Sequence, residues 1–69
     1  MTAEAKLRAL NARFDSVRIY RRLDGLWGIE ARRALPRDSR DYAPYAWAPT
    51  VAQAIGKLYD HEFGTVGAL

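Results

Sequence analysis

The chain has 69 residues, 49% hydrophobic and 28% charged, with a formal net charge of +3. It has no cysteine and one histidine, His61, which excludes disulfides and thiolate metal sites and leaves too few ligands for zinc. The length fits one domain, residues 1–69, and residues 1–10 carry charges where a signal peptide needs its apolar segment, so we expect a cytoplasmic protein without a membrane-spanning segment.

The first predicted element is a helix over residues 3–14. Thr2 precedes it as a cap, and the acidic Glu4 suits the positive end of the helix dipole. Its apolar positions follow the spacing of one helical face: Ala3, Leu7, Leu10 and Phe14.

A β-hairpin is predicted next, with strands over 16–22 and 26–34 around the turn Leu23-Asp24-Gly25. A two-residue turn would place Ile19 opposite Glu30 and mix core with charge. A three-residue loop with Gly25 in the left-handed conformation separates two faces. One face then pairs Val17 with Ala31, Ile19 with Ile29, and Arg21 with Trp27. The other pairs Arg18 with Glu30, Tyr20 with Gly28, and Arg22 with Leu26.

Residues 35–41 mix charges around Pro36 and are predicted to form a loop. Residues 42–48 alternate weakly and indicate a short third strand, which Pro44 confines to a sheet edge or delays. Two interpretations of its aromatic residues stand side by side. In one, Tyr45 and Trp47 fill the core and Tyr42 covers a loop. In the other, they form an exposed platform or a homodimer contact.

The second helix begins with the capping box Thr50-Val51-Ala52-Gln53 and ends at Gly64. Gly56 lies in its interior, and we expect it to mark a close approach to the sheet, under Trp27 or Trp47. Residues 65–69 are a short tail. The fold class is therefore α+β: a small antiparallel sheet of two or three strands, flanked by two helices on one face, in the order α-β-β-(β)-α.

Catalytic residue types are scarce. The only serines are Ser16 and Ser39, neither in a nucleophile motif, and no glycine-rich phosphate loop is present. The acidic residues of 37–41 alternate with arginines, and the run Asp60-His61-Glu62 points its side chains in different directions around a helix. We therefore expect no enzyme activity, no catalytic residues, no metal and no cofactor.

Charge is unevenly distributed along the chain. Residues 1–40 carry a net charge of +5 and residues 41–69 a net charge of −2, and nine of the eleven basic residues are arginine. Arginine and tyrosine are enriched at binding hot spots, although such residues also form ordinary solvated faces. The predicted partner-binding residues are Arg18, Tyr20, Arg21, Arg22, Arg32, Arg33, Tyr42 and Tyr45.

The order of elements resembles the double-stranded RNA-binding domain. That family reads phosphates with lysines at the start of its last helix, whereas here residues 50–55 contain none and Lys57 is the first basic residue. The family's Gly-Pro-His loop is also missing. The Asp24-Gly25 turn and the helix start Thr50-x-x-Gln-Ala-Ile are similar to HicB-type antitoxins over residues 17–59, apart from the added N-terminal helix and Pro49 in place of a glycine.

The arginine- and alanine-rich composition, with residues 23–27 and 50–55, also resembles small phage and prophage proteins of the anti-CRISPR inhibitor type. That resemblance implies a stoichiometric inhibitor that binds a host protein complex handling nucleic acid and blocks it. A protein-binding module is the first expectation. Direct nucleic-acid binding through the basic hairpin face, a HicB-like antitoxin role and a homodimer or purely oligomeric role are the alternatives.

Overall fold

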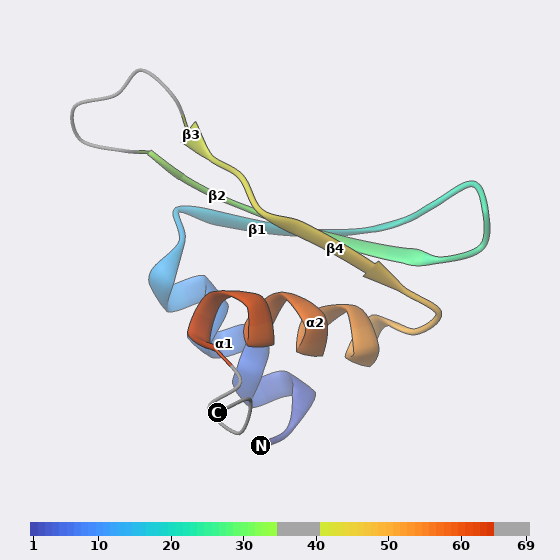
Figure 1. Ribbon diagram of the computed structural model, residues 1–69, viewed down its shortest axis with the longest axis horizontal. Helices are drawn as coiled ribbons and strands as arrows, with labels where there is room; N and C mark the ends of the chain where they lie inside the picture. Colours follow the sequence, from blue (N-terminus) through green and yellow to red (C-terminus); the bar gives the residue numbers. More distant parts are fainter. Residues whose placement is uncertain (35–40, 65–69) are drawn as a thin grey trace.

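The computed structural model describes residues 1–34 and 41–64. The antiparallel sheet has β2 in the middle, β1 on one side of it and both β3 and β4 on the other. Both helices lie on the same face of this sheet (Figure 1), which confirms the predicted α+β class. The elements in chain order are α1 (Ala3–Arg13), β1 (Ser16–Arg21), β2 (Trp27–Ala34), β3 (Asp41–Tyr42), β4 (Tyr45–Ala48) and α2 (Val51–Phe63).

The hairpin has the register expected for a three-residue loop. Ile19 lies opposite Ile29, Arg18 opposite Glu30 and Tyr20 opposite Gly28. Gly25 has a φ of 88°, and the Arg22 N–H donates to the Leu26 carbonyl at 2.8 Å, which closes the last pair before the turn. Because side chains alternate across a strand, this register fixes which residues of β1 and β2 face the helices.

The third row of the sheet consists of β3 and β4 in one continuous register, since Arg33 faces Tyr42 and Glu30 faces Tyr45. Pro44 lies between the two segments, where its carbonyl accepts a hydrogen bond from the Ala31 N–H at 3.0 Å. Proline has no N–H to return that bond, so the ladder is interrupted there without a shift in register. The predicted third strand is confirmed as an edge strand, and it already includes Asp41, which was expected in the loop.

The core lies between the sheet and the helices. α2 packs across β4 and β2, whereas α1 packs mainly on α2 and touches β1 only slightly. Small side chains on the sheet allow the helices to approach closely. The buried core residues are Leu10, Phe14, Ile29, Ala31, Ala48, Ala54, Ile55 and Leu58. Neither helix within the described ranges is long and apolar enough to cross a membrane.

The helix caps follow the sequence signals. The Thr2 hydroxyl accepts a hydrogen bond from the Ala5 N–H at 3.1 Å, and the Thr50 hydroxyl accepts one from the Gln53 N–H at 3.2 Å. α1 ends at Arg13, one residue earlier than predicted, and Phe14 is its C-cap.

The expectation for Gly56 was wrong. A methyl group added to Gly56 would meet the Lys6 Nζ of α1, at 3.8 Å from its carbon, and would meet no atom of the described sheet within 4 Å. Gly56 therefore faces α1 rather than the sheet. Residues 35–40 of the loop predicted over 35–41, and the tail over 65–69, lie outside the described residues.

Candidate functional site

In the part of the chain that the structure describes, one face of the sheet has no helix over it (Figure 1). The register places even-numbered residues of β1 and β2 and odd-numbered residues of β4 on this side. We call this surface the open face. Its side chains come from three strands and from the residue that follows β1: Arg18, Tyr20, Arg22, Glu30, Arg32, Tyr45 and Trp47.

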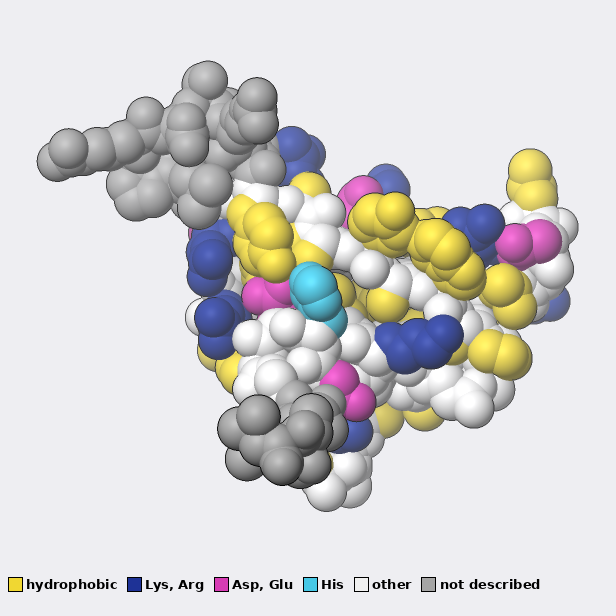
Figure 2. Space-filling model, viewed as in Figure 1, with side chains coloured by type: hydrophobic (Ala, Val, Ile, Leu, Met, Phe, Trp, Pro, Cys, Tyr) yellow, Lys and Arg dark blue, Asp and Glu magenta, His cyan; other side chains and the backbone are white. Residues whose placement is uncertain are grey.

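The open face carries large aromatic side chains in solvent. Tyr45 is 59% exposed and Trp47 is 38% exposed. Their rings stack with centroids 5.3 Å apart and an interplanar angle of 14°. Figure 2 shows hydrophobic side chains in a row along β4, with charged side chains beside them. Stacked, exposed rings present a rigid apolar surface that loses little conformational entropy when it is covered.

Tyr20 extends this aromatic surface across the neighbouring strands because position 28 is a glycine. A Cβ at Gly28 would lie 2.5 Å from the Tyr20 Cζ, so the ring occupies the space of the missing side chain. Gly28 also faces Trp47 on the other side. Tyr20 therefore lies flat over the middle strand, between β1 and the aromatic residues of β4.

Two arginines of the open face, Arg18 and Arg22, lie over these rings and are paired with carboxylates. The Arg18 guanidinium is 5.4 Å from the centre of the Tyr20 ring and 3.4 Å from the Glu30 carboxylate. The Arg22 guanidinium is 4.7 Å from the centre of the Trp47 ring. These are cation–π distances.

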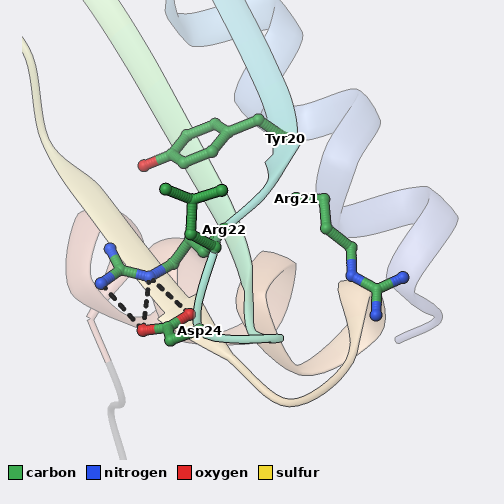
Figure 3. Close-up of a pocket in the computed structure, with 5 residues that line it drawn as sticks. Tyr20, Arg21, Arg22 and Asp24 are labelled. Atoms are coloured by element: carbon green, nitrogen blue, oxygen red, sulfur yellow. Dashed lines mark hydrogen bonds and ion pairs between the residues drawn. The ribbon is translucent and has the colours of Figure 1, made fainter.

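Asp24 in the turn holds Arg22 in place. The Arg22 Nε donates to both Asp24 carboxylate oxygens, at 3.2 and 3.1 Å, and a second guanidinium nitrogen lies 3.1 Å from one of them (Figure 3). The Leu26 N–H also donates to Asp24 at 3.1 Å. The hydrogen bonds from Arg22 and then from Leu26 lower the pKa of Asp24, and the hydrogen bond to Asp24 raises the pKa of Arg22. The turn is therefore ordered around a charge pair.

The predicted binding residues divide between the two faces. Arg18, Tyr20, Arg22, Arg32 and Tyr45 lie on the open face. The other three lie on the side of the helices: Arg21, Arg33 and Tyr42. Figure 3 shows Arg21 pointing away from Arg22 across the strand.

The three residues on the helix side have structural contacts. The Arg21 guanidinium lies 5.3 Å from the centre of the Trp27 ring. The Arg33 guanidinium lies 5.6 Å from the Tyr42 ring, which itself stacks on Phe14 at 6.2 Å. The structure thus does not bring these three side chains together with the aromatic residues of the open face.

The interpretation that Tyr45 and Trp47 fill the core was wrong. Their odd-numbered positions place them opposite Glu30 and Gly28, on the open face, while Ala46 and Ala48 face the helices. Tyr42 instead packs inward. Its hydroxyl donates to the Glu62 carboxylate at 2.6 Å, and this hydrogen bond raises the pKa of Tyr42.

Two important residues were missed by the sequence analysis. Trp47 was not among the predicted binding residues, although alternation with Tyr45 was a signal that would have included it. Glu62 accepts the Tyr42 hydrogen bond, and its side chain is only 4% exposed. Glu62, one of the acidic residues of 41–69, is therefore covered, whereas Asp60 on the same helix is exposed.

The described residues offer little catalytic chemistry. No group of three or more His, Asp or Glu side chains in ranges 1–34 and 41–64 could hold a metal ion. His61 and Glu62 do not diverge as expected, since the His61 Nε2 lies 3.7 Å from the Glu62 carboxylate. The His61 side chain is 64% exposed on the outside of α2, away from the open face. The absence of enzyme activity stays a prediction.

Comparison with known proteins does not extend these observations. No family model, curated protein or solved structure matches the chain. The resemblances to phage inhibitors and to HicB-type antitoxins therefore stay predictions from the sequence.

Proposed function

We propose that the protein is a non-enzymatic binding module whose open face contacts another protein. The observation that carries the proposal is the exposed, stacked pair of Tyr45 and Trp47 on a sheet face without a covering helix. Clustered aromatic and arginine side chains are the usual anchors of protein interfaces.

The pairing of arginines with carboxylates on the open face favours a protein partner over a polyanion such as nucleic acid. Sites for single-stranded nucleic acid combine stacking rings with cations that follow the phosphates. Here Arg18 is 3.4 Å from Glu30, and Arg22 is bound by Asp24. These carboxylates offset the charge of both arginines, so a run of phosphates gains less there, whereas an apolar protein surface could cover the rings and leave both ion pairs at its rim. The expected partner is therefore a folded protein with an apolar, aromatic-accepting patch.

Single-stranded nucleic acid is the second candidate. It is favoured by the flat position of Tyr20 over Gly28 beside Trp47, because three neighbouring rings on a sheet suit base stacking. A phage-type inhibitor of a host complex that handles nucleic acid is the narrowest form of the leading proposal. That form stands on the sequence resemblance alone.

The test compares an open-face variant with a control variant in protein capture. Immobilised wild-type protein, the double variant Tyr45→Ser with Trp47→Ser, and the control Arg8→Ser on α1 are each incubated with nuclease-treated host lysate. We expect the wild type and the control to retain the same protein in stoichiometric amount, and the double variant to lose it while its circular dichroism spectrum stays unchanged. Retention of that protein by the folded double variant would exclude the open face as the contact surface.

Salt dependence separates the two candidates. Phosphate contacts release counterions, so nucleic-acid affinity falls steeply with salt, whereas a contact centred on buried rings keeps most of its affinity. We expect the captured protein to remain bound as salt is raised from about 50 to 200 mM, the range over which several phosphate contacts lose ~10³-fold in affinity or more. Loss of all binding after nuclease treatment would instead support the nucleic-acid alternative.

A further inference from the structure

The outer edge of β1 has the features of a site for strand addition. Among the described residues, the only sheet neighbour of β1 is β2. The Arg22 N–H donates to Leu26 in the returning arm of the hairpin, so the backbone groups of even-numbered residues in β1 point toward β2. In an antiparallel ladder these alternate with groups that point outward. The N–H and C=O groups of Val17, Ile19 and Arg21 therefore lie along the outer edge.

The other edge of the sheet, along β4, is protected against pairing with a further strand, and in this it differs from the β1 edge. β4 has only four residues, and it lies between Pro44 and Pro49. The Lys57 ammonium donates to the Trp47 carbonyl at 3.1 Å, which occupies one backbone acceptor on that edge. Short length, flanking prolines and lysine are common means of blocking edge pairing. β1 has six residues, Ser16–Arg21, and contains no proline.

The side chains beside the β1 edge are incompletely buried on the helix side. Val17 and Ile19 belong to the apolar face and pack against the core, yet both are only half-buried. The cause is the position of α1, which packs mainly on α2 and barely contacts β1. A further strand beside β1 would place its own apolar side chains next to Val17 and Ile19 and remove them from water.

Charge selects the kind of strand that fits. Arg18 on the open face and Arg21 on the helix side flank the edge, and the Arg18 side chain is 72% exposed. A second copy of β1 would add its own Arg18 and Arg21 to this edge and raise the density of positive charge there, which is unfavourable. A carboxylate of an acidic segment could instead share the exposed Arg18 guanidinium, which has five N–H donors, with Glu30. The edge is therefore protected against self-association but complementary to an acidic extended segment.

We propose that β1 binds an acidic, extended segment of the protein partner as an added antiparallel or parallel strand. The backbone of the segment bonds to the outward groups of Val17, Ile19 and Arg21. Its apolar side chains cover the first two of these residues, and its carboxylates lie near Arg18. This inference rests on the proposed function, because the partner that covers the open face would supply the segment.

The test uses two synthetic peptides, Glu-Val-Glu-Val-Glu-Val-Glu and Lys-Val-Lys-Val-Lys-Val-Lys, both with blocked ends. Amide hydrogen exchange of the full chain is followed by NMR with each peptide. We expect the acidic peptide to slow exchange at the Val17, Ile19 and Arg21 amides and to leave the Tyr45 and Trp47 amides unchanged. The basic peptide should protect neither edge. Protection confined to β4, or equal protection by both peptides, would overturn the proposal.

Charge reversal provides a readout that a purely structural role would not change. In the double variant Arg18→Glu with Arg21→Glu, the preference should invert, so that the basic peptide binds at least about tenfold more tightly than the acidic one. Ile19→Pro removes an outward N–H without removing a bond to β2, and it should abolish protection at the edge. If Ile19→Pro fails to fold, the peptide preference of the charge-reversal variant tests the proposal by itself. An unchanged preference for the acidic peptide in the folded double variant would overturn the proposal.

Failure of this inference can be distinguished from failure of the proposed function. If Tyr45→Ser with Trp47→Ser loses the captured protein but β1 shows no protection by the acidic peptide, only the strand addition is wrong. If that variant keeps its partner while β1 still binds the acidic peptide, the open-face proposal is wrong and the edge site stands. Self-association of the chain through β1, seen as concentration-dependent protection without peptide, would overturn the edge inference.

Discussion

The two faces of the sheet differ in the size of their side chains along β4. The large side chains lie on the solvent side, whereas a core usually takes them. Along β4, the helix-covered side carries the small residues Ala46 and Ala48, while the open side carries Tyr45 and Trp47. Ala48 is 2% exposed and Tyr45 is 59% exposed. A chain of 69 residues has little apolar surface to spare for its core. Large rings placed in solvent by such a chain support the proposal that the open face binds a partner.

The largest expected effect contrasts one residue from each face. Ile29→Ala removes a fully buried side chain and should destabilise the fold by about 2–5 kcal/mol. Trp47→Ala removes a larger side chain, yet that side chain is 38% exposed, so the loss should be smaller than for Ile29→Ala. Urea unfolding of both variants measures the difference. A greater loss of unfolding free energy for Trp47→Ala than for Ile29→Ala would contradict the difference between the two faces.

Gly28→Ala tests how the open face is built. The added methyl group would collide with the Tyr20 ring, and we expect a loss of about 1–3 kcal/mol. The collision is specific to one neighbour, so Tyr20→Ala in the same chain should recover most of the loss. Thermal unfolding of the two single variants and the double variant gives the coupling energy. Additive effects would show that the ring does not lie over Gly28.

Tyr42→Phe tests the helix-covered side. Loss of the 2.6 Å hydrogen bond to the covered Glu62 carboxylate should cost about 1.5–3 kcal/mol at neutral pH. The hydrogen bond to Glu62 raises the pKa of Tyr42 above its ordinary value of 10.0, so the folded state binds this proton more tightly than the unfolded state. The contribution of this tighter proton binding to the free energy of unfolding is complete below pH 10 and is lost as pH rises through the folded-state pKa of Tyr42. The stability of the variant, measured by urea unfolding, should therefore fall less between pH 10 and higher pH than that of the wild type.

Asp24→Asn should have the smallest effect on stability. The hydrogen bonds from Arg22 and Leu26 lower the pKa of Asp24 below its ordinary value of 3.8. A lowered folded-state pKa stabilises the fold above the unfolded-state value, and the contribution disappears as pH falls through the folded-state pKa. Carboxyl NMR titration should show this pKa in the wild type. The contact of the Arg22 guanidinium with the Trp47 ring should loosen in Asp24→Asn, and an unchanged Trp47 environment would contradict the statement that Asp24 holds Arg22 in place.

Several features of the fold could be predicted because they depend on local chemistry. The register of the hairpin follows from the need for a residue with positive φ in the turn, which is Gly25. The pair Thr50 and Gln53 marks the start of α2. The alternation that groups Tyr45 with Trp47 was also visible. Which face the rings of Tyr45 and Trp47 would occupy was not, because that choice depends on how Ala46 and Ala48 fit beneath α2.

The buried network around Glu62 could not be predicted for a similar reason. Tyr42 and Glu62 lie 20 residues apart, and their contact depends on how α2 crosses the sheet. The position of Gly56 against α1 depends on the same crossing. Sequence patterns describe each element, whereas contacts between elements follow from their packing.

The two tryptophans provide the most direct test, because one lies on each face. Trp47 stands on the open face, and Trp27 lies on the helix side opposite Ala48. The captured protein is titrated into the chain labelled with nitrogen-15, and the two indole N–H signals are followed. We expect the Trp47 signal to shift or broaden in proportion to complex formation. A Trp47 signal that stays unchanged in a saturated complex would contradict the claim that the open face is the binding surface.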